Sequence, residues 1–151
     1  MRVSIRIDRG PRSGETLLKV IVGFVVIVGV IGVFAYNGYV KSMVESNMLK
    51  LKNADRMIKE AYGNTRERDI GWAELEYNDT IEFIDLHKPY ARLLPAGDEL
   101  VKLEREAYAR LALLCMAQGR GDEARKWAAR YLEVAPESES DERRRRLEQL
   151  L

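Results

Sequence analysis

The sequence predicts an all-α fold, in which one N-terminal transmembrane helix precedes an array of helical hairpins and a C-terminal capping helix. Residues 20–40 form a run of 21 residues without a charge. Beyond this run, apolar residues recur at steps of three and four, which is typical of one buried helix face. No alternating run of the length that a strand needs appears after residue 40.

The apolar run has the length and the borders of a membrane span. As a helix it extends over roughly 31 Å, close to the thickness of a bilayer's hydrocarbon core. Lys19 and Lys41 bracket it, and Tyr36 and Tyr39 lie at its C-terminal edge, where amphipathic rings favour the membrane interface. We therefore predict a single-pass membrane protein, with membrane lipid as one partner.

A cleaved signal peptide is the alternative interpretation of this run. The N-terminal stretch is basic, and Val33, Phe34 and Ala35 resemble a cleavage site, which would leave a secreted helical protein beginning at Tyr36. The run is longer than the apolar part of a usual signal, so a retained anchor is the preferred interpretation.

The distribution of positive charge predicts the orientation. Residues 1–19 hold five basic side chains, whereas residues 41–56 hold four. Because basic flanks stay on the cytoplasmic side, we expect a cytoplasmic N-terminus and a helical domain in the periplasm or outside the cell.

Glycine and proline divide the chain beyond the span. Gly63 and Asn64 predict a helix stop, followed by a charged loop over 65–71. A second break begins at Pro95 and a third at Gly119. The predicted parts are a basic tail (1–16), a transmembrane helix (17–40), a divergent repeat-like hairpin (41–97), a second hairpin (98–138) and a capping helix (139–151).

The apolar positions predict which helix faces are buried. We expect the helix after the span to bury residues that include Met48. A helix over 72–87, ended by Pro89, should bury Trp72, Leu75, Phe83 and Ile84. A helix over 98–118 should bury Leu100, Leu103, Ala107, Leu111, Leu114 and Cys115. Asp98 and Asp122 are candidate N-caps for the third and fourth helices.

Residues 105–138 resemble one tetratricopeptide repeat (TPR). The residues that carry the resemblance are Tyr108, Leu111, Ala112, Gly119, Ala124 and Pro136, which fall at the spacing of that 34-residue pattern. Three positions depart from the pattern: Cys115 and Ala128 replace rings, and Tyr131 replaces a small residue. The resemblance implies a TPR-like hairpin over 98–138.

The same resemblance implies a protein-binding scaffold. The first helix of such a hairpin lines a concave face, which here carries Glu106, Arg110, Leu113 and Met116. Leu113 and Met116 would make apolar contacts with a partner, and Arg110 would hold a carboxylate or a backbone oxygen. The alternative is that Leu113 and Met116 pack against a neighbouring helix as ordinary core.

The sequence offers little for catalysis. His87 and Cys115 are the only histidine and cysteine, and no phosphate-binding, hydrolase or metalloprotease motif is present. We therefore expect no enzyme activity, catalytic residue, cofactor, metal site or small-molecule substrate. Near-neutral net charge gives no reason to expect nucleic acid.

The sequence is consistent with two functions. The first is a membrane-anchored scaffold that binds other membrane or envelope proteins. The alternative is a permanent structural subunit of a membrane complex, whose span packs against other spans.

Overall fold

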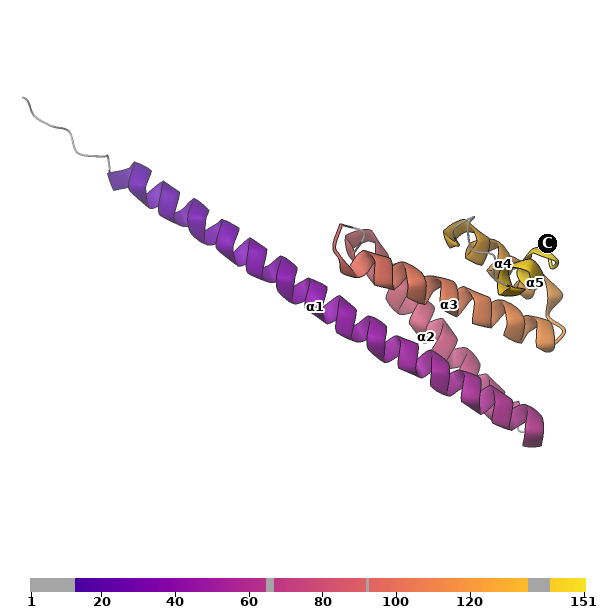
Figure 1. Ribbon diagram of the computed structural model, residues 1–151. Coiled ribbons are helices and arrows are strands. Elements are labelled where there is room, and N and C mark those ends of the chain that lie inside the picture. The colour runs from indigo at the N-terminus through magenta and orange to yellow at the C-terminus, as the bar shows by residue number, and fades with distance from the viewer. Residues whose placement is uncertain (1–12, 65–66, 92, 136–141) are drawn as a thin grey trace, which may run out of the picture. The chain divides into compact units, whose positions relative to one another are not determined.

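The computed structural model describes residues 13–64, 67–91, 93–135 and 142–151, and these residues form helices without any strand (Figure 1). The all-α prediction is therefore confirmed for this part of the chain. The helices are α1 (Ser13–Asn64), α2 (Glu67–Ala91), α3 (Ala96–Ala117), α4 (Gly121–Val134) and α5 (Glu142–Glu148). The chain divides into two compact units, Met1–Tyr36 and Asn37–Leu151. Residues 1–12 of the expected N-terminal tail, Pro136 and residues 139–141 of the expected capping helix lie outside the described residues, whereas residues 13–16 of the tail already belong to α1.

The first unit consists of the apolar part of α1. Its Val, Ile and Phe side chains between residues 20 and 34 are 49–73 % exposed. Among the described helices, α1 is the one that is long and apolar enough to cross a membrane, with a mean hydropathy of 2.8 in its most apolar window. It is therefore a candidate membrane span, as the run of uncharged residues predicts.

The second unit begins with an antiparallel pair formed by α1 and α2. Each helix buries residues at alternating steps of four and three, the spacing of helices that pack along a shared seam. The buried residues of α1 are Val40, Val44, Asn47, Leu51 and Ala54, and those of α2 include Ala73, Tyr77, Thr80 and Ile84. Tyr39 meets His87 at one end of the pair, and Asp55 meets Tyr77 further along.

The predicted limits of the second helix are wrong. The loop expected over 65–71 is too long, because α2 already begins at Glu67, and the helix continues past Pro89 to Ala91. Proline removes only the hydrogen bond to the carbonyl four residues before it, which is that of Asp85. Asp85 is exposed to solvent, so its carbonyl group can be hydrated where the helix is about to end.

Hydrophobicity alone was wrong for two of the four residues predicted to be buried on α2, whereas Ile84 is buried as predicted and Phe83 is half-buried. Trp72 and Leu75 are 51 % and 54 % exposed, whereas Ala73 and Tyr77 are buried. Likewise, Met48 of α1 is only half-buried, and Asn47 is buried in its place. The seam therefore mixes large apolar residues with small and hydrogen-bonded ones.

Polar groups within this seam are paired. The single hydroxyl proton of Thr80 is shared between the carbonyl of Glu76, at 2.8 Å, and Asn47 Oδ1, at 3.4 Å. The Asn47 amide donates to the carbonyl of Met43 at 2.9 Å. Because a buried polar group costs stability only when it lacks a partner, these residues are tolerated in the core.

Neither predicted aspartate caps a helix. α3 begins at Ala96 and α4 at Gly121, so Asp98 and Asp122 lie within the first turns. Acidic side chains there favour the positive end of the helix dipole without a capping hydrogen bond. At α3, the Ala96 N–H donates instead to Asn37 Oδ1 of α1 at 3.1 Å. The cap of α3 is therefore supplied by a distant side chain.

α3 packs between α2 and α4 in the second unit (Figure 1). The stripe predicted for α3, from Leu100 to Cys115, is buried at every expected position. Gly119 adopts φ +73° in the turn to α4, a conformation that only glycine takes without strain. Leu147 of α5 is buried against this pair, whereas Leu150 is half-buried and Leu151 is exposed.

The α3–α4 contact predicts a loss of stability at alkaline pH. Tyr108 stacks on Trp127 and donates to Glu104 Oε1 at 3.1 Å. Burial, followed by the nearby Glu104 carboxylate, raises the pKa of Tyr108 to about 12. The unfolded chain ionises this phenol near pH 10. The contribution of Tyr108 is therefore complete below that pH and falls between pH 10 and about 12.

The Tyr108→Phe variant isolates this effect. We expect its free energy of unfolding, measured with urea, to be lower than that of the wild type by about 1 kcal/mol at pH 8. The difference should shrink between pH 10 and about pH 12. A difference that does not change with pH would contradict this role of Tyr108.

Candidate partner-binding site

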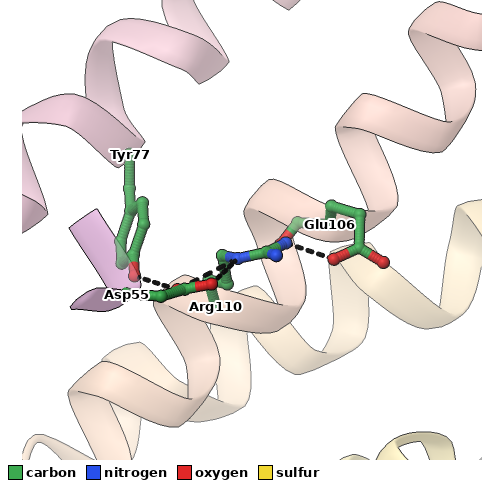
Figure 2. A network of polar contacts seen from close by, with 4 residues as sticks. All are labelled: Asp55, Tyr77, Glu106 and Arg110. Carbon is green, nitrogen blue, oxygen red and sulfur yellow. Dashed lines mark hydrogen bonds and ion pairs between the residues drawn. The ribbon is translucent and has the colours of Figure 1, made fainter. Parts of the chain in front are cut away.

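Four side chains from three helices form a polar network in the second unit, as Figure 2 shows. Arg110 Nε of α3 donates to both carboxylate oxygens of Asp55 on α1, at 3.1 and 2.9 Å. The phenol of Tyr77 on α2 donates to Asp55 Oδ1 at 2.7 Å. Arg110 Nη1 donates to the Glu106 carboxylate, which confirms the ion pair that their spacing of four residues suggests.

Burial and the carboxylates of this network determine the protonation states of Arg110 and Tyr77. Burial opposes the charge of Arg110, but its hydrogen bond to Asp55 and the charges of Asp55 and Glu106 raise the pKa of the guanidinium. Burial and the hydrogen bond to Asp55 also raise the pKa of Tyr77. Arg110 therefore stays charged and Tyr77 stays neutral at ordinary pH, and together they join α1, α2 and α3.

A groove follows the seam between α1 and α3. It consists of three hollows of about 390, 460 and 190 Å³, and the middle hollow shares lining residues with each of the others. The hollows are lined on α1 by Val44, Glu45, Met48, Leu49, Lys52, Asp55 and Ile58, and on α3 by Glu99, Lys102, Arg105, Glu106, Arg110, Leu113, Leu114 and Ala117. We call this surface the α1–α3 groove. Apolar side chains and both signs of charge meet along it.

The predicted partner-binding residues occupy three different settings. Glu106 and Arg110 belong to the polar network, and the side chain of Arg110 is only 16 % exposed. Leu113 is half-buried and lines the smallest hollow. Met116 is exposed near the end of α3. Partner binding by these four residues stays a prediction, and the carboxylate that Arg110 holds here is Asp55 of its own chain.

Sequence reasoning missed Asp55, which anchors the network. Its partner Arg110 is 55 residues away, so no spacing rule connects them. The available signal was local: Asp55 directly follows the buried Ala54, at the border of the α1 seam. Lys52 and Lys102 were missed for the same reason, because they come together only where α1 and α3 meet.

His87 and Cys115 are the residues best suited to act as a metal ligand or a nucleophile, but both are packed among neighbouring side chains. The His87 ring lies 4.6 Å from Phe83 and 5.7 Å from Tyr39, measured between ring centroids. Cys115 is fully buried, and burial raises the pKa of its thiol despite the nearby Arg120. Within the described part of the chain, no group of three or more His, Cys, Asp and Glu side chains is arranged to hold a metal ion.

The chain was also compared with known proteins. No protein-family model matches it, and neither a curated protein nor a solved structure shows significant similarity to it.

Proposed function

We propose that this chain is a single-pass membrane protein whose second unit is a binding scaffold for other membrane or envelope proteins. One observation carries the proposal: the exposed apolar surface of residues 20–34 has no polar face, whereas the second unit closes a core of its own. Such a helix is stable in lipid and unstable in water. The chain therefore acts by contact near a bilayer, without catalysis.

The α1–α3 groove is the surface that we assign to the partner. Apolar residues such as Met48 and Leu113 lie beside Lys52 and Lys102, so a partner segment with apolar anchors and acidic flanks fits it. The resemblance of residues 105–138 to a tetratricopeptide repeat, which remains a proposal, supports the same function. Its buried Tyr108 and Ala124 and the positive φ of Gly119 agree with that pattern.

Crosslinking tests the groove. We expect a photoreactive amino acid at Leu113 or Met48, which both line the groove, to capture the same partner in a fixed ratio when the full chain is in its native membrane. The control position is Leu75, which is more exposed than Leu113 but lies outside the groove, so that access alone would favour capture at the control. Lys102→Glu should lower the yield at the groove positions. Equal capture at Leu75, or no capture at Leu113 and Met48, would contradict the assignment.

The second candidate function is that of a permanent structural subunit of a membrane complex. Purifying the second unit by itself distinguishes this function from that of a binding scaffold. The fragment must begin at Asn37, because Val40 is fully buried and Asn37 caps α3. We expect the fragment 37–151 of a binding scaffold to purify as a soluble, folded monomer. The fragment 41–151 should lose about 2 to 4 kcal/mol of stability in urea unfolding. Aggregation of both fragments would favour the permanent subunit.

We propose that the N-terminus is cytoplasmic and that the second unit lies on the opposite side of the membrane. Protease protection of the residues after Lys41 in sealed vesicles tests this orientation. The greater number of basic residues before the span supports it.

A further inference from the structure

One end of the second unit carries exposed apolar side chains that neither its core nor the α1–α3 groove uses. Leu86 and Tyr90, four residues apart on α2, are 64 % and 68 % exposed, and Leu93 in the following turn is 90 % exposed. Tyr39 of α1 lies at the same end, because its ring contacts His87. We call these four residues the apolar end.

A hydrogen bond holds the apolar end next to the last turn of the uncharged run over residues 20–40. Asn37 and Tyr39 belong both to residues 20–40 and to the second unit. The hydrogen bond from Ala96 N–H to Asn37 Oδ1, 3.1 Å long, holds the turn that contains Leu93 beside this part of α1. If residues 20–40 span a bilayer, Leu93 and Tyr90 therefore lie at the depth where the span leaves the lipid.

The apolar end carries no acidic side chain that would oppose insertion. The sequence from Leu86 to Pro95 has no acidic residue, and the charge of Lys88 is directed to the buried Glu104. Acidic side chains resume at Asp98 and Glu99, and Glu99 is 3.8 Å from Lys41. Tyrosine favours the region of the lipid headgroups, and leucine favours the acyl chains below them.

We infer that the apolar end rests in the bilayer interface, with Tyr39, Tyr90 and Leu93 inserted among the lipid headgroups. This inference rests on the proposed membrane anchoring. It adds a second membrane contact, made by α2 and the turn after it. The second unit would thereby be held against the lipid surface, with the apolar end facing the membrane.

Fluorescence quenching in vesicles tests the inference with the full chain. Bimane would be attached to a new cysteine at Leu93, at Leu75 or at Ile27, and the wild type, with its buried Cys115, serves as the labelling blank. Leu75 is the matched control, since it is an exposed leucine on α2 about four helical turns before Tyr90. The vesicles contain phosphatidylcholine and phosphatidylglycerol with brominated acyl chains, at a low ratio of protein to lipid. Iodide serves as the aqueous quencher.

We expect brominated lipid to quench the label at Leu93 and at Ile27, and iodide to quench only the label at Leu75. If Ile27 is quenched by lipid but Leu93 only by iodide, the inference fails and the anchor stands. If Leu93 is protected from both quenchers, another protein chain covers the apolar end, and the inference also fails. If brominated lipid does not quench Ile27, the membrane anchor itself fails.

Discussion

Replacing Ile27 and Ile31 together by arginine is expected to release the chain from membranes. Both side chains are exposed, and they lie one helical turn apart in the middle of the apolar run. On an insertion scale, the Val, Ile and Phe residues of the run favour the membrane by roughly 4 to 7 kcal/mol. Two central arginines change this balance by about 6 to 8 kcal/mol in the unfavourable direction. The span should then no longer insert.

The measurement is the fraction of chain that sediments with membranes after an alkaline carbonate wash. The wild type should stay with the membranes, and the Ile27→Arg, Ile31→Arg variant should appear in the supernatant or be degraded. The matched control replaces the exposed Leu49 and Leu75 of the second unit by arginine, and it should remain in the membranes. Release of the control to the same extent would show that charge acts through folding instead of insertion.

The second large effect is expected at Lys88, which neutralises a buried carboxylate. Glu104 of α3 is only 1 % exposed, and its Oε1 lies 2.5 Å from Lys88 Nζ of α2. Its other oxygen, Oε2, is buried without a hydrogen-bond partner within the described residues. Replacing Lys88 by methionine keeps most of the side-chain volume but leaves this carboxylate uncompensated. We expect a loss of about 3 to 5 kcal/mol in the free energy of unfolding.

A second ion pair provides the control for this prediction. Lys50 lies 3.7 Å from Glu76 across the seam between α1 and α2, but both side chains are substantially exposed. Lys50→Met should therefore cost less than about 1 kcal/mol in the same urea titration. The double variant Lys88→Met, Glu104→Gln should regain part of the lost stability, because it removes the uncompensated charge. Equal losses for Lys88→Met and Lys50→Met would show that burial of Glu104 does not determine the effect.

Periodicity and breaker residues predicted much of the fold. The α3 stripe from Leu100 to Cys115 was predictable because large apolar residues recur there at helical spacing. The turn at Gly119 was predictable because the chain needs a left-handed residue between two helices. The apolar run predicted the candidate span through its length alone.

The remaining features depend on contacts between distant residues. Hydrophobicity ranks Trp72 above Ala73, but two helices that approach closely need the smaller side chain at the seam. Asn47 is polar, yet it is buried because Thr80 donates a hydrogen bond to it. The link between Asp55 and Arg110, and hence the α1–α3 groove, exists only once α1 and α3 are side by side. No local pattern in the sequence encodes such a pair.

The burial of Cys115 has a consequence for the compartments in which this protein can fold. Its thiol is the only one in the chain, and it is enclosed by the core around α3. Oxidants and glutathione therefore have no accessible thiol to modify, and no intramolecular disulfide has to form. The second unit should reach the same native state under reducing and oxidising conditions, so thiol chemistry places no restriction on the side of the membrane where it folds.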